Sequence, residues 1–344
     1  MGSACSGAQA SCCHCPGGNG RMRLHRFRSA LGRARRDAGY ALGLVKAVRV
    51  APPCHPRVEV EAEGRLSGLA PFLAGTQSGL LYVEGGRAWR LHGGSVYGLA
   101  SNRDPRRWYV FQRVPQSFGR LLRVDLEKGT ARSLAGFLST GVHQVDVVDG
   151  RLVVMDTYRN GIAHYSERGK RLRTVYPSGP VADGRDSANY RHFNSLFAAP
   201  DAVYVLAHNQ SAKTGMDSEI FVLDRTWQTI RVIPTGSGSA HNVAEIDGRL
   251  WHCDSRGGGL VVGRKTVFQE TDLFTRGLAV NRTHVLVGGS QITEREHRGR
   301  TDGEVIVLDR AFEPQGRMRF SRSGGVQEIR FLQGDLAMSS TGAS

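Results

Sequence analysis

The chain has 344 residues, of which 40% are hydrophobic and 22% charged, and its formal net charge is +15. This length is enough for one large domain or two, with a substantial buried core. The 44 glycines against 12 prolines are typical of an all-β protein with many turns, and they exclude a chain that is collagen-like or disordered throughout.

The positive charge is concentrated near the amino terminus. Residues 1–56 contain nine Lys and Arg, between Arg21 and Arg49, against one acid, Asp37, so this segment carries +8 and the rest of the chain only +7. Binding to nucleic-acid phosphates depends on clustered cations. The thin spread of charge beyond residue 56 therefore argues against nucleic acid as a partner of the main body, and leaves nucleic-acid binding by the amino-terminal segment as a third hypothesis.

The first 56 residues divide into two segments. Residues 1–21 are rich in Cys and Gly and are expected to be disordered, with Met22 as an alternative start. Residues 22–56 form a basic extension with the pattern of an amphipathic helix, which fits a protein surface or, as the second interpretation, a membrane surface. Charged residues interrupt its apolar part, so it is a poor signal peptide. The chain contains no run of about 18 apolar residues, so no transmembrane segment is predicted.

The cysteines are unevenly distributed. Five of the six lie in the first 54 residues, and Cys253 stands alone in the main body. A secreted disulfide framework would place paired cysteines through the folded domain, so we predict a reduced, cytoplasmic protein. The run Cys12–Cys15 lacks a second, distant pair of ligands and is not expected to hold zinc. Cys253 itself fits buried packing better than a nucleophile.

Beyond residue 56 the chain repeats a unit of four short strands. In one copy "HQVDVV" alternates as a strand, "DG" makes the turn, and "RLVVMD", "GIAHYS" and "RLRTVYP" supply three more strands. The same order recurs in the stretches that begin "YGLAS", "HFNSLF", "HNVAEI" and "RGLAV". An earlier unit, "PFLAGT" to "RAWRLH", lacks a first strand, which "GVQEIRFL" near the carboxyl end supplies.

This arrangement predicts a six-bladed β-propeller over residues 57–344, closed by pairing of the two ends of the repeat region. Sharing one blade between the two ends of the chain hides the edges of the ring. Five or seven blades stay open as alternatives, because "VEVEAEG" (Val58–Gly64) has no assigned place. The six first strands are predicted to open near Tyr97, His143, His192, His241, Arg276 and Gln327.

Longer runs carry a family resemblance. They are "GTQSGLLYVEG", "SAHNVAEIDGRLWHCDS", "LFTRGLAVNRTHVLVGGSQITERE", "GEVIVLD" and "GGVQEI", between residues 66 and 332, and "FTRGLAV…VGGS" is the most specific of them. Together they resemble an uncharacterised, mostly bacterial β-propeller family known only as a domain of unknown function. The resemblance implies the propeller fold and an association with sulfotransferase or carbohydrate-modifying proteins, and it assigns no catalytic residue.

The predicted fold gathers polar residues at one mouth of the channel. First strands line a propeller channel, and the loops between second and third strands reach the face where first strands begin, because neighbouring strands alternate in direction. His143, His192 and His241 stand 49 residues apart at three successive first strands. Three neutral imidazoles with an open fourth position are typical of a catalytic divalent metal site, so we predict that they bind zinc, iron or manganese.

Other residues at the predicted mouth complete a candidate site. Arg276 and Tyr97 flank the histidines and are predicted to be catalytic, by binding an anionic substrate or transferring a proton. The residues predicted to bind substrate are Gln327, His208, Asp156, Asp254 and Arg295. His208 and Asp254 could instead orient the metal ligands. Asp156 and Asp254 could also be ordinary turn residues. The charged loop Ser290–Gly303, which contains Arg295, is either a lid or a solvated loop.

Two function classes follow. The first is a metal-assisted enzyme, a lyase, hydrolase or isomerase, that acts on a small polar or anionic substrate at the channel mouth. The second is a non-catalytic propeller that binds a ligand or protein and serves a carbohydrate- or metabolite-modifying system, with a partner enzyme. A structural interpretation competes with both, because histidines at strand starts also hold blades together through backbone hydrogen bonds. The sequence leaves the substrate, the metal and the oligomeric state open.

Overall fold

The computed structural model describes residues 48–50, 55–102, 104–114, 118–181, 187–294 and 297–338. The predicted tail, residues 1–21, and most of the predicted extension, residues 22–56, lie outside the described residues. Within the described ranges, no helix is both long and apolar enough to cross a bilayer.

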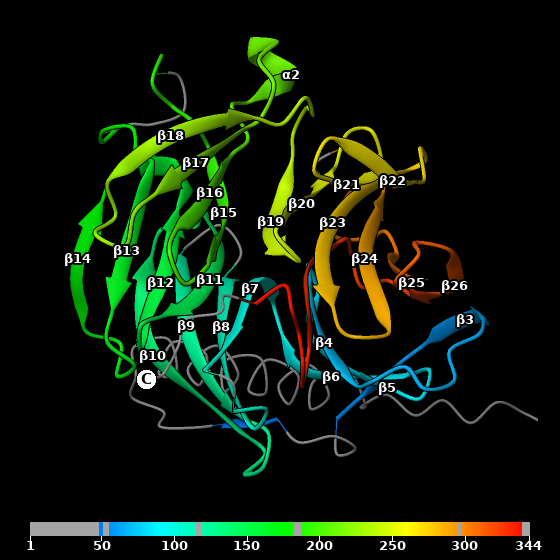
Figure 1. Ribbon diagram of the computed structural model, residues 1–344. Helices are drawn as coiled ribbons and strands as arrows, with labels where there is room; N and C mark the ends of the chain where they lie inside the picture. Colours follow the sequence, from blue (N-terminus) through cyan, green and yellow to red (C-terminus); the bar gives the residue numbers. More distant parts are fainter. Residues whose placement is uncertain are drawn as a thin grey trace, which may run out of the picture.

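Six antiparallel sheets are arranged in a ring (Figure 1), which confirms the predicted six-bladed propeller. The inner strands are β7 (Ser95–Ser101), β11 (Val142–Val148), β15 (Phe193–Ala198), β19 (His241–Ile246), β23 (Leu273–Val280) and β27 (Val326–Phe331). The second strands are β8 (Arg107–Val114), β12 (Arg151–Asp156), β16 (Val203–Ala207), β20 (Arg249–Asp254), β24 (His284–Gln291) and β4 (Phe72–Thr76).

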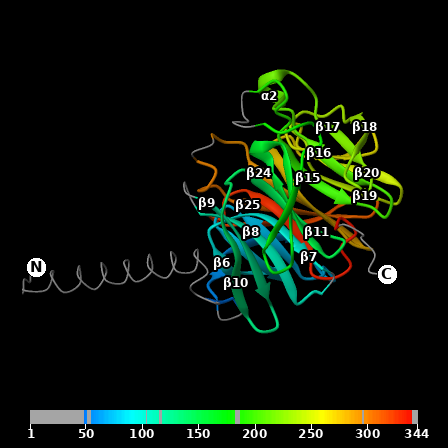
Figure 2. The same ribbon diagram turned by 90° about the vertical axis from the view of Figure 1, so that its left-hand side faces the viewer.

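The outer half of each blade has two further strands. The third strands are β9 (Phe118–Asp125), β13 (Gly161–Tyr165), β17 (Glu219–Leu223), β21 (Gly259–Val262), β25 (Gly303–Asp309) and β5 (Gly79–Glu84). The fourth strands are β10 (Thr130–Leu138), β14 (Arg171–Val175), β18 (Thr229–Pro234), β22 (Lys265–Gln269), β26 (Pro314–Phe320) and β6 (Arg87–Gly93). Two short helical turns, η1 (Thr157–Arg159) and α2 (Ser211–Thr214), follow β12 and β16, and α2 projects beyond the strand ends in both views (Figures 1 and 2).

The ring closes as predicted, through strands from the two ends of the repeat region. β27 pairs antiparallel with β4, from Val326 opposite Thr76 to Phe331 opposite Phe72. Three short strands then add to outer edges: β1 (Val48–Arg49) to β10, β2 (Arg57–Val58) to β6, and β3 (Val60–Gly64) to β26. The run "VEVEAEG" thus covers the edges of two blades and forms no seventh blade, which protects those edges from pairing with other chains.

Apolar side chains fill the space between neighbouring blades. Alternation along each strand sends side chains to both faces of its sheet, and each face packs against the next blade. Trp251, for example, is fully buried in a cluster that joins Phe197 and Leu278, residues of the two flanking blades. The packing holds the six inner strands in fixed relative positions, which is what places the side chains at their ends.

Every inner strand has a β-bulge near the end where it begins. The interrupted registers lie between residues 96 and 98, 142 and 145, 193 and 195, 241 and 244, 275 and 278, and 326 and 328. A bulge inserts one extra residue and re-aims the neighbouring side chains. Tyr97, Asn194 and Gln327 are themselves extra residues with no partner on the second strand. The ring of six bulges marks one mouth of the channel.

Candidate functional site at the channel mouth

A cavity of about 480 Å³ opens at the bulged ends of the inner strands. Six of the residues predicted from the sequence line it: Tyr97, His143, His192, His208, His241 and Arg276. The others that line it are Gln77, Arg113, Tyr158, Tyr190, Gln210, Phe274 and Arg298. This volume is that of a small-molecule site, and no Asp or Glu is among the described residues that line it.

The imidazole rings form a row along the wall of this cavity. Ring centroids are 4.9 Å apart for His143 and His192, 4.7 Å for His192 and His208, and 5.5 Å for His208 and His241. Tyr97 continues the row beyond His143 at 5.8 Å. His208, which comes from the end of β16, therefore lies between two of the three predicted metal ligands.

The three histidines are not at equivalent positions, although the sequence spacing suggested it. His143 lies inside the bulge of β11, His241 is the last paired residue before the bulge of β19, and His192 precedes β15. Equal spacing conceals these offsets because the loops between blades differ in length. The rings reach the mouth at successive levels and form a row. Among the described residues, no group of three or more His, Cys, Asp or Glu side chains is arranged to hold a metal ion, and the metal site stays a prediction.

A hydrogen bond sets the proton position on the His143 ring. Its Nδ1 lies 2.8 Å from the carbonyl oxygen of Gly141, and a carbonyl only accepts, so Nδ1 carries the proton and Nε2 is left with a lone pair. Nδ1 of His241 lies 3.0 Å from the carbonyl oxygen of Ser239 and 2.8 Å from the hydroxyl oxygen of Ser255, which can donate or accept. The His143 ring is thus prepared to accept a proton or to bind an electrophile through Nε2.

Burial keeps these imidazoles neutral. Desolvation lowers the pKa of His143 well below its usual 6.5, and His192, Arg113 and Arg276 lower it further. The pKa of His241 is lowered in the same way by burial and then by Arg276. Burial and Arg276 also lower the pKa of His208, to about 4. These three side chains therefore accept protons or donate single hydrogen bonds at neutral pH, without adding charge to the cavity.

The charge of the cavity comes from arginines that surround Tyr97. The Cζ atoms of Arg113 and Arg276 lie 3.4 Å and 5.2 Å from the centroid of the Tyr97 ring. Burial acts to raise the pKa of Tyr97, but the two guanidinium groups and hydrogen bonds from Ser95 and Gln77 outweigh it, so the pKa is lowered from 10. Tyr97 therefore releases its proton more readily than an ordinary tyrosine.

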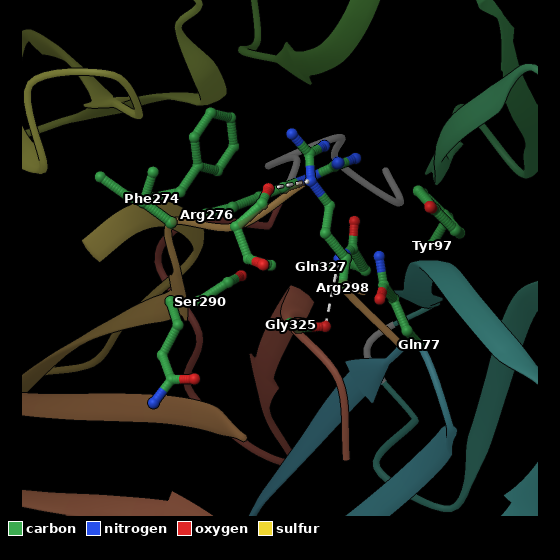
Figure 3. A pocket seen from close by; sticks show the side chains of 11 residues that line it. Gln77, Tyr97, Phe274, Arg276, Ser290, Arg298, Gly325 and Gln327 are labelled. Carbon is green, nitrogen blue, oxygen red and sulfur yellow. Dashed lines mark hydrogen bonds between the residues drawn. The ribbon is translucent and has the colours of Figure 1, made fainter. Parts of the chain in front are cut away.

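A second, smaller compartment adjoins the first. It measures about 80 Å³, and it shares Gln77, Tyr97, Phe274, Arg276 and Arg298 with the larger cavity (Figure 3). Its other walls are Ser290, Gln291, Ile292, Thr293, Gly325 and Gln327. The predicted substrate-binding residue Gln327 thus lies at the mouth, in this second compartment.

Two of the predicted site residues, Asp156 and Asp254, are not brought to the cavity. Asp156 is paired with Arg159 at 3.7 Å, and Asp254 accepts the backbone N–H of Gly257 at 3.2 Å. Neither aspartate lines either compartment. Arg295 lies outside the described residues. Cys253 is fully buried beside the mouth, and burial raises its pKa, which agrees with a packing role.

Two lining residues, Arg113 and Gln77, were not predicted from the sequence, although the topological rule applies to them. Arg113 lies one residue before the end of β8, and Gln77 follows β4, the second strand of the closing blade. Both lie where second strands lead into third strands, the position from which His208 was predicted. Tyr158 lies in the same kind of connection, in η1 between β12 and β13, whereas Tyr190 lies in the irregular connection before β15 and carries no comparable signal.

Comparison with known proteins identifies the fold and no family. No protein-family model and no curated protein matches the chain. Similar solved structures include a chain of the nidogen–laminin complex, with a TM-score of 0.56 and 12% identity over 76% of this chain and 97% of that one. A protein of unknown function from Bacteroides caccae has a TM-score of 0.52 and 12% identity over 76% of this chain and 98% of that one. A gluconolactonase from Xanthomonas campestris has a TM-score of 0.52 and 16% identity over 82% of this chain and 92% of that one. At these identities the likeness shows the propeller alone. The uncharacterised Bacteroides protein is consistent with the resemblance to a family of unknown function.

Proposed function

We propose that the channel mouth binds a small organic anion and catalyses a proton-transfer reaction on it, as a lyase, hydrolase or isomerase. The observation that carries this proposal is Arg276. Its side chain is only 9% exposed, and no described carboxylate lies within ion-pair distance of it. Burial lowers its pKa only to about 10, so the group stays cationic at neutral pH. A buried, unpaired charge is costly, and an anionic ligand would supply the missing partner.

The surrounding residues supply an acid and a base. With the anion on Arg276, the Nε2 lone pair of His143 takes a proton from the carbon beside a bound carboxylate, or from a water molecule. The Tyr97 hydroxyl donates its proton to the departing or developing oxygen, and Arg113 beside it stabilises the phenolate that remains. Removal of a proton from carbon is the chemistry of a lyase or isomerase, and removal of a proton from water is the chemistry of a hydrolase.

A metal-assisted version is the second candidate. It is supported by the Nδ1–H bond of His143 to the carbonyl oxygen of Gly141, the arrangement by which metal-binding histidines present Nε2. In this version His143, His192 and His241 would hold zinc, iron or manganese, which would polarise a substrate oxygen or lower the pKa of bound water. Elemental analysis of wild type and His241→Ala tests it: one equivalent of metal, lost in the variant, supports it, and metal-free active protein contradicts it.

Fold does not separate an enzyme from a binding protein, because propellers serve both. The neighbours illustrate this, since one is a gluconolactonase and another belongs to the nidogen–laminin complex. The absence of Asp and Glu among the described lining residues, together with a tyrosine of lowered pKa, favours chemistry on an anion. The predicted cytoplasmic location and partner enzyme stay predictions that fractionation and pull-down would test.

The proposal is tested by incubating the protein in D₂O with a panel of hydroxy acids, uronic acids and their lactones, and following each compound by ¹H NMR. This readout detects hydrolysis, elimination, isomerisation and exchange of a carbon-bound proton. We expect at least one compound to change with wild type and to stay unchanged with Tyr97→Phe. Compounds that bind but never react or exchange would overturn the proposal in favour of a non-catalytic binding propeller.

A further inference from the structure

We propose that the smaller compartment binds hydroxyl groups, so that the ligand of this protein is a small polyhydroxylated anion, a sugar acid or a sugar phosphate. This inference rests on the proposed function, because the larger cavity must first hold the anionic group at Arg276. It adds the chemical class of the rest of the molecule. The two compartments share Tyr97 and Arg276 as a common wall, so one ligand can occupy both.

Two amide oxygens in this compartment lack a hydrogen-bond donor. Oε1 of Gln327 and Oε1 of Gln77 are buried and accept no hydrogen bond from the described residues. Gln327 is only 5% exposed, so water does not solvate its side chain freely. Buried acceptors without partners are rare in proteins and costly, because desolvation is not compensated. A ligand that donates hydrogen bonds at these two points would remove the cost.

The orientation of the Gln327 amide follows from its own hydrogen bond. Its Nε2 donates to the carbonyl oxygen of Gly325 at 3.1 Å, as Figure 3 shows. Since the nitrogen is held there, Oε1 is the atom left for a ligand. Gln77 likewise leaves its Oε1 without a partner among the described residues. Both amides therefore offer acceptors, and an anion's oxygens cannot satisfy them.

The shape of the compartment suits small polar groups. Ser290 adds a hydroxyl to the wall, and Phe274 adds an apolar face. Gly325 keeps the space open, because a Cβ at this position would clash with the Ser290 side chain. A volume of about 80 Å³ has room for several waters, or for the hydroxylated carbons that would replace them. The two amide oxygens need hydrogen-bond donors, and the adjoining cavity needs an anion. A ligand whose hydroxyl groups lie next to a carboxylate or phosphate supplies both.

The test is calorimetric titration with four probes. D-gluconate carries both a carboxylate and hydroxyl groups, acetate carries only the carboxylate, sorbitol carries only the hydroxyl groups, and glucose 6-phosphate replaces the carboxylate by a phosphate. We expect gluconate or glucose 6-phosphate to bind at least about tenfold more tightly than acetate and sorbitol, and the tighter of the two identifies the anionic group.

Variants locate the effect in the smaller compartment. Gln327→Leu should weaken binding of the tighter probe about tenfold and leave acetate binding unchanged, because one hydrogen-bonding group is lost. Gln269→Leu is the matched control, since Gln269 is exposed and its Nε2 also donates to a glycine carbonyl, that of Gly257, at 3.0 Å. Gly325→Ala, which narrows the same compartment from the backbone, should repeat the loss if Gln327→Leu does not fold.

The outcomes separate the two proposals. If acetate binds as tightly as gluconate and glucose 6-phosphate, and Gln327→Leu binds every probe like wild type, the inference about hydroxyl groups is wrong while anion binding stands. If no anion binds, acetate included, and Arg276→Met is indistinguishable from wild type, the proposed function fails as well.

Discussion

Arg276 and Arg330 are two buried guanidinium groups in the same channel, and they are balanced in opposite ways. Arg330 on β27 is 3% exposed, forms an ion pair with Glu328 at 3.1 Å, and donates to the carbonyl oxygen of Leu278 at 2.9 Å. Arg276 on the neighbouring strand β23 faces Tyr97 and has no carboxylate within ion-pair distance among the described residues. One charge is neutralised inside the protein, and the other is the charge that we propose an anionic ligand neutralises.

The pKa values record this difference. Burial lowers the pKa of Arg276 to about 10, with only partial compensation from Tyr97 and Glu328. Burial acts on Arg330 as well, but Glu328 and Asp335 outweigh it and its pKa is raised. Asp335 in turn accepts the backbone N–H groups of Val280, Phe331 and Ala337. The deeper part of the channel is therefore a network of paired charges, and the mouth is where we propose that the ligand binds.

The largest expected effect is on stability. Arg330→Met should lower the free energy of unfolding by about 3–5 kcal/mol, because it leaves the buried Glu328 carboxylate unpaired. Arg276→Met should leave the free energy of unfolding unchanged or raise it, because it removes an unpaired charge. Urea unfolding measures the free energy of unfolding of both variants. Equal losses in the two would show that Arg276 and Arg330 are balanced in the same way.

The next effect is on rate. Tyr97→Phe should lower turnover of any substrate found by NMR about 10²–10⁴-fold, the usual contribution of a general acid, while the Kd stays within about threefold. Single-turnover kinetics with a parallel titration separates the two quantities. A variant that loses binding and rate together would show that Tyr97 holds the ligand and transfers no proton. Arg113→Lys, which keeps the charge but not the planar stacking, is the companion variant.

A smaller effect is the pH dependence of stability. The pKa of His208 is lowered to about 4, so its contribution to stability is fully present above 6.5 and is lost as the pH falls from 6.5 through about 4. His208→Gln should therefore flatten the decline in Tm over that range. Glu328 has the opposite sign: its pKa is raised to about 7, so its contribution is present below 4.5 and is lost as the pH rises through about 7. If the Tm of His208→Gln falls as steeply as that of wild type between pH 6.5 and about 4, the imidazole of His208 is not desolvated.

The fold was predictable because its signals are local and repeated. Alternating apolar residues mark each blade without reference to the others, and the Asp-Gly turns Asp149–Gly150 and Asp247–Gly248 mark two of the blades. The closing pair β27 and β4 followed from a missing first strand. The pairing of β3 with β26 could not be predicted, because the exposed, charged side chains of an edge strand do not indicate which strand it pairs with.

The site was predictable in position but not in register. Tyr97, Arg276 and Gln327 were placed correctly because apolar residues follow each of them at the same distance. The offsets of His192 and His241 depend on bulges, and a bulge changes backbone pairing without changing the apolar pattern. The unpaired state of Arg276 depends on the absence of nearby carboxylates in three dimensions, which spacing along the chain does not reveal.

The smallest expected effect concerns a predicted residue that does not line the cavity. Asp254→Asn keeps an acceptor for the N–H of Gly257, so we expect the Kd for any ligand of the mouth to change less than about twofold. Calorimetric titration of this variant beside wild type measures it. A tenfold loss would mean that Asp254 reaches the ligand after all.

In the proposed function Arg276 is a buried charge whose partner is an anionic ligand, and titration of gluconate, glucose 6-phosphate and acetate into wild type and Arg276→Met tests this most directly. We expect saturable, roughly one-to-one binding of at least one of these anions to wild type, and a loss of about 10–100-fold in affinity for it in a variant that remains folded. Equal affinity in the two proteins, or no binding of any of the three to wild type, would contradict it.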